Sequence, residues 1–261
     1  MERNAPISVI ARGPDGDLWL LGGEGQLLRC NSKNGCQSWE ISQPGNQPFY
    51  PYRIAVDDEG TVWVASSSGL QRFSDGRVET LTEDQGLSNT FAIDLLVDRD
   101  QVLWVATESG LDKISQPAFW NFKWQKNFPV NSVWAIEELP DGSVWMGTND
   151  GIVSVDPEWR TRVWTEADGL PEPSVVDVKA PDRGDVWVLG YSGLYRWNGQ
   201  QFITYPQSEL ESLNLYEVLP INDREVWICT SYGVYRLDPY TNRLVHPCEP
   251  GIRSVQCASA R

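Results

Sequence analysis

The chain has 261 residues, and length alone suggests one or two domains. Its 36 Asp and Glu residues outnumber its 21 Lys and Arg residues, which gives a formal net charge of −15 spread along the chain. A surface of that sign repels nucleic-acid backbones and anionic membranes, and no run of 18 apolar residues is present. We therefore expect neither a nucleic-acid partner nor membrane insertion.

One motif recurs six times along the chain, and each copy is centred on a tryptophan. The tryptophans are Trp19, Trp63, Trp104, Trp145, Trp187 and Trp227, with spacings of 44, 41, 41, 42 and 40 residues. Six residues after each stands a glycine: Gly25, Gly69, Gly110, Gly151, Gly193 and Gly233. Nine residues before each stands a branched aliphatic: Ile10, Ile54, Leu95, Ile136, Val178 and Val218. Three registers kept over six copies indicate an internal repeat.

Each repeat predicts four strands. An apolar stretch and the run around the tryptophan are separated by a turn such as "PDGD", which is typical of an antiparallel hairpin. The second strand is apolar at consecutive positions, as in Val62–Val64, so we expect both of its faces to be buried. The glycine ends this strand where a positive φ or a close backbone approach is needed. Third and fourth strands follow, as in "GLQRF" and "RVETLT".

Four short strands in every repeat, without helical periodicity, predict an all-β fold: a six-bladed β-propeller of four-stranded antiparallel blades. We expect one domain, residues 1–261, in which the six tryptophans wedge neighbouring blades together. The expected blades are residues 5–44, 45–85, 86–126, 127–168, 169–208 and 209–247. A tail, 248–261, follows near the ring seam; because "PGIRSVQCASAR" looks like the start of another blade, a fragment of a seven-bladed propeller is the alternative.

Two stretches carry a "GL", an apolar strand, an Asp-containing hairpin and a "GL" third strand. They are residues 86–114, "GLSNTFAIDLLVDRDQVLWVATESGLDKI", and residues 169–197, "GLPEPSVVDVKAPDRGDVWVLGYSGLYRW". In these features the chain resembles the two-component regulator propeller repeats. The resemblance covers all six blades, although blade one has an extra residue and places Gln26 where the others have Leu, Ile or Val. It implies a scaffold that commonly forms the extracytoplasmic sensing part of hybrid sensor kinases, often for carbohydrate-derived signals.

Four cysteines are candidates for disulfides. Cys30 and Cys36 flank the hairpin "CNSKNGC" in blade one, and Cys248 and Cys257 follow the last strand of blade six. The sequence allows three pairings, of which Cys30 with Cys36 and Cys248 with Cys257 is our first hypothesis. The fifth, Cys229, is predicted to be a small buried hydrophobe.

Disulfides would suit an oxidising compartment, so we expect an extracytoplasmic location, periplasmic or secreted. The sequence does not begin with an apolar segment of signal-peptide length, so an extracytoplasmic chain would be a mature or excised domain. Unpaired thiols in a cytoplasmic protein are the alternative.

The sequence contains no catalytic or metal-binding motif that we recognise, so we expect no enzyme, no metal and no cofactor. Its Asp-rich turns lack the calcium-loop pattern, and turn chemistry explains them. The single histidine, His246, is in the predicted outer strand of blade six. A weaker alternative is an enzyme similar to the streptogramin lyases, whose blades look related. That resemblance implies a histidine base near the ring centre, where we do not expect His246.

We expect a ligand at the mouth of the propeller, where the loops between second and third strands meet the segments that lead into each blade. Those loops offer Glu24, Glu108, Asp150, Tyr191 and Tyr232. Ten residues before the tryptophan, on the innermost strands, stand Arg53, Asp94, Asp177 and Glu217. Buried charges are costly unless they are paired or hydrated, so these four are predicted to line a wet channel, with Arg53 pairing with Asp94.

Aromatic residues mark two further surfaces. Those in the lead-in segments are Phe49, Tyr50, Tyr52, Trp134 and Tyr216. Aromatic rings beside carboxylates suit a small polar molecule or glycan fragment, which predicts a non-catalytic ligand-sensing propeller. Trp120, Phe122 and Trp124 alternate along one outer strand, where we expect them to pack on the neighbouring blade. If they are exposed instead, they favour the alternative of a protein–protein interaction platform.

Overall fold

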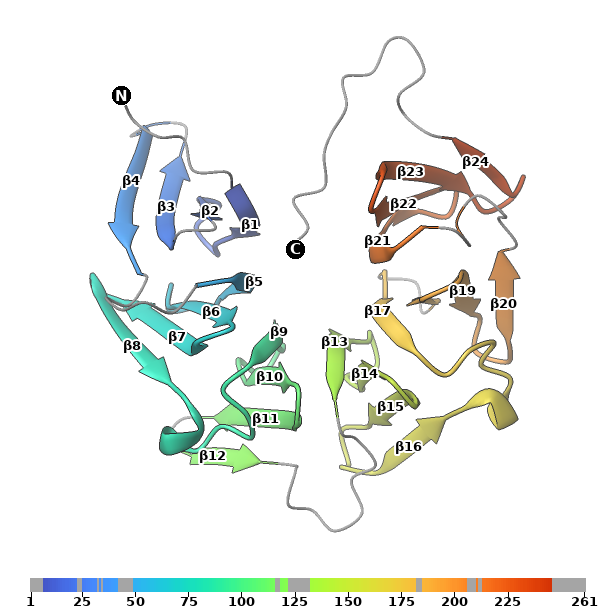
Figure 1. The fold of residues 1–261 in the computed structure, drawn as a ribbon, viewed down its shortest axis with the longest axis horizontal. Coiled ribbons are helices and arrows are strands. Elements are labelled where there is room, and N and C mark those ends of the chain that lie inside the picture. The colour runs from blue at the N-terminus through green and yellow to red at the C-terminus, as the bar shows by residue number, and fades with distance from the viewer. Residues whose placement is uncertain are drawn as a thin grey trace. The chain divides into compact units, whose positions relative to one another are not determined.

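The computed structural model describes residues 7–22, 25–31, 33, 35–41, 49–115, 118–121, 132–181, 185–205, 210 and 213–245. Within these residues, 24 strands form six antiparallel sheets of four strands each, in chain order (Figure 1). We number the sheets as blades one to six. The chain forms two compact units, Met1–Val133 and Trp134–Cys257, and the boundary falls at the first residue of strand β13. The predicted all-β class with four-stranded blades is confirmed.

The first unit contains blades one to three, drawn from blue to green in Figure 1. Blade one consists of β1 (Ile7–Arg12), β2 (Leu18–Gly22), β3 (Gln26–Asn31) and β4 (Gly35–Glu40). Blade two consists of β5 (Pro51–Val56), β6 (Val62–Ser66), β7 (Gly69–Ser74) and β8 (Arg77–Leu81). Blade three consists of β9 (Ala92–Val97), β10 (Leu103–Thr107), β11 (Gly110–Ser115) and β12 (Ala118–Asn121).

The second unit contains blades four to six. Blade four consists of β13 (Val133–Glu138), β14 (Val144–Thr148), β15 (Gly151–Val155) and β16 (Thr161–Trp164). Blade five consists of β17 (Val175–Lys179), β18 (Val186–Gly190), β19 (Leu194–Trp197) and β20 (Phe202–Tyr205). Blade six consists of β21 (Leu215–Asn222), β22 (Glu225–Thr230), β23 (Gly233–Asp238) and β24 (Arg243–Val245).

The hydrophobic cores lie between successive blades inside each unit. In the first unit, Trp19 packs in one cluster with Ile54 and Phe73 of blade two, and Trp63 packs with Leu95 and Leu103 of blade three. In the second unit the same relation joins blade four to blade five and blade five to blade six. The repeat tryptophans of those two clusters are Trp145 and Trp187. The wedge role predicted for the repeat tryptophans is confirmed at these four positions.

Two further interactions hold the tryptophan ring: a hydrogen bond from its indole N–H and a basic side chain near the ring. The indole N–H of Trp63 donates to Asp57 over 3.1 Å, and that of Trp104 donates to Asp98 over 2.7 Å. Both aspartates also accept backbone N–H bonds inside their own turns. A basic side chain on the third strand lies 5.1 to 5.9 Å from the ring in four blades: Arg29, Arg72, Lys113 and Arg196. The third-strand basic residue and the turn aspartate are therefore parts of the tryptophan site.

Short 3-10 helices lie at the start of two of the links between blades. They are η1, Glu83–Gln85, and η3, Glu166–Asp168, and each carries a capping box. The glycine that follows each helix has a positive φ, and the next residue is buried: Leu87 after η1 and Leu170 after η3. The repeated "GL" of the sequence is thus a helix stop followed by an anchor in the core between blades.

A disulfide joins Cys30 and Cys36, which lie directly opposite each other on β3 and β4. This half of the first disulfide hypothesis is confirmed. Cys229 is disulfide-bonded as well, and its partner lies outside the described residues. The prediction that Cys229 is simply a buried hydrophobe is therefore wrong, because its sulfur is already used in a covalent bond. Cys248, Cys257 and the tail 248–261 lie outside the described residues.

The glycine six residues after the tryptophan gives the first test of this fold. Gly151 has a φ of +130°, and a Cβ there would overlap the carbonyl oxygen of Trp164. Gly199 has a φ of +88° with no atom within 4 Å of such a Cβ. Gly199→Ala should therefore cost only the strain of a left-handed residue, about 1 kcal/mol. Gly151→Ala should cost at least about 3 kcal/mol in the free energy of unfolding by urea, because the overlap adds to that strain. Equal losses would contradict a close backbone approach at Gly151.

Candidate functional site

In blades two, three and six the loop between the second and third strands lies beside the segment that leads into the first strand. Backbone N–H groups of the loop donate to carbonyls of that segment: Ser67 to Tyr50 over 3.0 Å, Glu108 to Phe91 over 3.3 Å and Ser231 to Asn214 over 2.9 Å. These bonds bring the two predicted sets of mouth residues to the same end of the blade. We call this end the mouth end.

A buried hydroxyl shapes most of the mouth-end loops. Three residues after the tryptophan, the side chain donates to the carbonyl of the repeat glycine over 2.9 to 3.0 Å and accepts from the N–H two residues on. The hydroxyls belong to Ser66, Thr107, Thr148 and Thr230. The polar residues before the glycine are thereby held in a tight turn that points their side chains outward.

The innermost strand begins with a β-bulge in five blades, where one residue of the first strand is skipped in the pairing with the second. The residue that follows the bulge is the one ten positions before the tryptophan, as at Arg53, Asp94, Asp177 and Glu217. A bulge turns the strand and re-aims the next side chain. It therefore decides where these four charges point.

Arg53 and Asp94 form an ion pair between blades two and three. The Arg53 Nε lies 2.7 Å from Asp94 Oδ1, and the same oxygen accepts the N–H of Leu95 over 2.9 Å. The Asp94 side chain is only 3% exposed, whereas that of Arg53 is 32% exposed. The predicted pairing is confirmed.

Asp177 has the same role between blades five and six. Its Oδ1 accepts the N–H of Val178 and its Oδ2 accepts the N–H of Val218 on the next blade, both over 2.9 Å. Lys179 Nζ lies 3.3 Å from Asp177 and 3.6 Å from Glu137. A single carboxylate therefore joins β17 to β21 and also balances a half-buried lysine.

The expectation that these charges line a wet channel is wrong for Asp94 and Asp177. Both residues are 2% exposed, because the bulge turns the carboxylates onto the backbone N–H groups of the strand start instead of into water. Arg53 and Glu217 are half-buried. Their role toward a ligand remains a prediction.

The loop residues at the mouth end are much more open. Tyr191 is 59% exposed and Tyr232 is 75% exposed, and Glu108 and Asp150 are exposed too. Trp134 is half-buried and its indole donates to Asn149 Oδ1 over 2.9 Å. Glu24 lies outside the described residues. The ligand-binding role of this set also remains a prediction.

An aromatic group accompanies Glu108 in the first unit. The rings of Tyr52 and Phe91 are 5.2 Å apart, and Tyr50 is 47% exposed. The pKa of Tyr52 is raised, first by burial and then by the negative charge of Glu108 and the neighbouring Tyr50. This end of blades two and three thus presents aromatic faces next to a carboxylate.

Sequence reasoning missed Glu172 in blade five. Blade five has Gly190 where four other blades have the buried hydroxyl, and Glu172 occupies the space that a side chain at Gly190 would fill. Glu172 accepts the N–H and the hydroxyl of Ser192 over 3.1 Å and the hydroxyl of Tyr195 over 2.7 Å. The signal was the glycine itself, because a missing hydroxyl in a regular repeat predicts a replacement acceptor nearby.

Other classes of site find little support in the described part of the chain. Among those residues, no group of three or more His, Cys, Asp or Glu is placed to hold a metal ion. In the same part, no helix has both the length and the apolar character that a membrane crossing needs. His246, Phe122 and Trp124 lie outside the described residues, and so does the side chain of Trp120.

Comparison with known proteins supports the repeat. A family model described as "Two component regulator propeller" matches residues 127–150. The chain carries a two-component regulator propeller repeat. The resemblance seen in the sequence is confirmed, although the match falls at the start of blade four and not in residues 86–114 or 169–197. No curated protein matches the chain.

Solved structures share the fold of this propeller-repeat chain at low identity. One is the extracellular domain assigned to the hybrid two component system BT3049 of B. thetaiotaomicron, with TM-score 0.72 and 18% identity over 98% of this chain and 36% of that one. Another is virginiamycin B lyase from Staphylococcus aureus, solved with quinupristin, with TM-score 0.69 and 14% identity over 88% of this chain and 78% of that one. The chain spans only about a third of the length of the B. thetaiotaomicron domains, 35% and 36%. The fold is a β-propeller, and the described residues supply six blades.

The buried carboxylate of Asp177 gives a second test. Asp177→Ala leaves the N–H groups of Val178 and Val218 without their acceptor and should cost about 3 kcal/mol in the free energy of unfolding. Asp150→Ala removes an exposed carboxylate and should cost less than about 0.5 kcal/mol. Urea unfolding measures both. A loss at Asp177 no larger than that at Asp150 would mean that Asp177 does not join the blades.

Tyr195 gives a third test, in alkaline solution. Burial, and then the hydrogen bond to Glu172, raise the pKa of Tyr195 in the folded chain. A tyrosine in the unfolded chain ionises near pH 10, so the unfolded state loses its proton first. Stability should therefore be constant below about pH 10 and should fall as the pH rises further.

Tyr195→Phe should cost about 1 kcal/mol at neutral pH, through the lost hydrogen bond, and should flatten the alkaline fall. Tyr191→Phe changes an exposed tyrosine and is the control. The measurement is the urea midpoint of unfolding at pH values between about 7 and about 11.5, a range that includes the ordinary pKa of tyrosine. An unchanged alkaline slope in Tyr195→Phe would contradict the assignment.

Proposed function

We propose that this chain is a non-catalytic propeller domain that binds a small polar ligand, such as a glycan fragment, at its mouth end. The observation that carries the proposal is the division between buried and exposed polar groups there. The carboxylates of Asp94, Asp177 and Glu172 accept hydrogen bonds or form ion pairs that join strands, blades and loops. Tyr191 and Tyr232 expose more than half of their surface on the same kind of loop.

Aromatic faces with nearby carboxylates suit a sugar, because its C–H face packs on the ring and its hydroxyls donate to the carboxylate. Tyr52, Phe91 and Glu108 offer this combination in the first unit. In blade six, Tyr216 is 36% exposed on the innermost strand and Tyr232 lies in the loop of the same blade. Exposed tyrosines on rigidly held loops favour recognition, since little conformational entropy is lost on binding.

The comparisons agree with a sensing role outside the cytoplasm. Two of the similar structures are extracellular domains of systems described as one component or hybrid two component, and the disulfide of blade one suits an oxidising compartment. We therefore propose an extracytoplasmic sensing domain. The single-domain organisation of residues 1–261 is part of this proposal.

A protein–protein interaction platform is the second candidate, and one observation favours it. Trp159 is 49% exposed at the turn between β15 and β16, with a φ of +67°. A large exposed aromatic side chain at a hairpin tip is suited to contact with another protein. Val163, on the edge strand of the same hairpin, is 36% exposed.

The lyase alternative has weaker support. The similar virginiamycin B lyase is catalytically inactive when one of its histidines is replaced by alanine. This chain has one histidine, His246, which directly follows the outermost strand of blade six. We propose that it takes no part in catalysis.

A ligand screen with matched tyrosine variants tests the proposal. A thermal-shift panel of neutral, acidic and amino sugars should contain at least one stabilising compound, because a ligand of the folded state raises the melting temperature. For that compound, Tyr232→Ala should weaken binding in calorimetry by roughly tenfold through loss of stacking. Tyr240→Ala is the control, since Tyr240 is 68% exposed in the same blade but lies in the turn between β23 and β24.

Three results would count against the proposal. Equal weakening by both tyrosine variants would place the ligand elsewhere, and a panel without any stabilising sugar would favour the interaction platform. Conversion of a streptogramin antibiotic to a new chromatographic product, abolished by His246→Ala, would overturn the non-catalytic assignment.

A further inference from the structure

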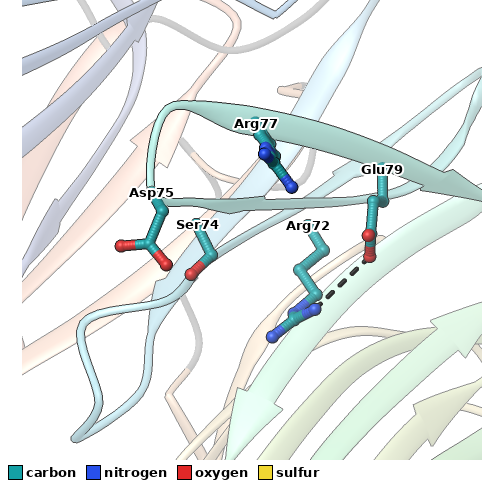
Figure 2. Close-up of a pocket in the computed structure, with 5 residues that line it drawn as sticks. All are labelled: Arg72, Ser74, Asp75, Arg77 and Glu79. Carbon is teal, nitrogen blue, oxygen red and sulfur yellow. Dashed lines mark hydrogen bonds and ion pairs between the residues drawn. The ribbon is translucent and has the colours of Figure 1, made fainter.

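The hairpin of β7 and β8 in blade two carries a hollow of about 400 Å³ that lies away from the mouth end. It is lined by Arg72, Ser74, Asp75, Arg77 and Glu79, which gather around the hairpin in Figure 2. Arg72 lies opposite Glu79 and Ser74 lies opposite Arg77, so these four side chains share one face of the hairpin. Strand β7 runs from the mouth-end loop at Gly69 to Ser74, which places the hollow at the other end of the blade.

Arg72 is held in place but keeps hydrogen-bonding capacity. Its guanidinium lies 5.9 Å from the centre of the Trp63 ring, and its Nη1 is 3.3 Å from Glu79. The Nε is buried and has no hydrogen-bond partner among the described residues. Glu79 is 65% exposed, so water screens this ion pair and its contribution is small.

Arg77 is the second cation of the hollow. It is exposed, and within the described residues its side chain makes no hydrogen bond or ion pair. The hydroxyl of Ser74, directly opposite, is without a partner in the same part of the chain. Two guanidinium groups and one hydroxyl therefore converge with donors to spare.

The equivalent hairpin of blade six has a carboxylate in place of Ser74 and is therefore a useful comparison. Arg236 and Arg243 occupy the places of Arg72 and Arg77 in the strand register, but Arg243 lies opposite Asp238, where blade two has Ser74. Blade two thus has a neutral donor where blade six has a carboxylate. Among the described residues, this hairpin thus brings together two arginines that are not fully paired, in a chain with a net charge of −15.

We propose that the hollow binds a small hydroxylated solute through an oxyanion, a carboxylate or a phosphate, held between Arg72 and Arg77. The planar guanidinium forks match either group with paired hydrogen bonds, and Ser74 donates a further one. Asp75 and Glu79, which also line the hollow, are acceptors for hydroxyl groups of the same solute. A volume of about 400 Å³ is in the range of small-ligand sites.

The test is a ¹H–¹⁵N NMR titration of the whole chain at constant ionic strength. The probes are inorganic phosphate, glucuronate and, as a neutral match for the second, glucose. We expect saturable shifts of the Ser74, Asp75 and Arg77 amides with at least one anionic probe and none with glucose. Phosphate alone or glucuronate alone would identify which oxyanion the site prefers.

Variants distinguish binding of an anion in the hollow from nonspecific attraction of anions to positive charge. Arg77→Gln should raise the Kd of the active probe at least about tenfold, since charge-assisted hydrogen bonds are lost. Ser74→Asp should do the same by giving Arg77 the carboxylate that Arg243 faces in blade six. Arg243→Gln, an equal charge change on the equivalent strand, should leave the Kd within about twofold.

Unsaturable shifts, equal shifts with glucose, or equal losses in Arg77→Gln and Arg243→Gln would overturn the proposal. Each variant is accepted only if its spectrum outside blade two matches that of the unmodified chain. A loss of ligand binding at the mouth end would leave this test untouched, because the two sites lie at opposite ends of the blade.

Discussion

The requirement to bury a tryptophan in the middle of every second strand governs the structure of this chain. Its ring supplies the apolar surface that holds one blade against the next, as Trp63 does with Leu95 and Leu103. Its N–H must find an acceptor inside a core, and in blades two and three the turn aspartate supplies one. That aspartate also closes the turn, so a single residue links the hairpin shape to the packing between blades. The repeat is therefore a set of mutually dependent positions.

Sequence reasoning recovered the fold because these positions leave a regular pattern. The tryptophan, the glycine six residues later and the inner aliphatic residue each have a structural role that recurs from blade to blade. Their spacing is therefore regular even where the rest of the sequence differs between blades. The exception is Ile10, which is 60% exposed although its counterparts Ile54 and Val218 are buried. The pairing of Arg53 with Asp94 was also predictable, since equivalent positions on successive inner strands are neighbours.

The side-chain environment at the mouth end was not predictable in the same way. A β-bulge leaves no sequence mark, yet it turns Asp94 and Asp177 from the expected water-filled surface onto backbone N–H groups. A strand counted without the bulge places every later side chain one step out of register. The role of Glu172 was missed because Glu172 lies in the segment that leads into blade five, whereas the hydroxyl that it replaces lies on the second strand of four other blades.

These observations separate the polar residues of the chain into two populations. Carboxylates that bridge blades are buried and fully bonded, and a ligand could reach them only by breaking the packing that defines the fold. The residues proposed for recognition are therefore those that the repeat does not need: the loop tyrosines at one end of the blades and, at the other, Arg77 of blade two, whose side chain has no partner among the described residues. Because Ser74 lies outside the hydrophobic clusters between blades, a serine in place of an aspartate there alters one hairpin without disturbing that packing. The two proposed sites therefore place no conflicting demands on the fold.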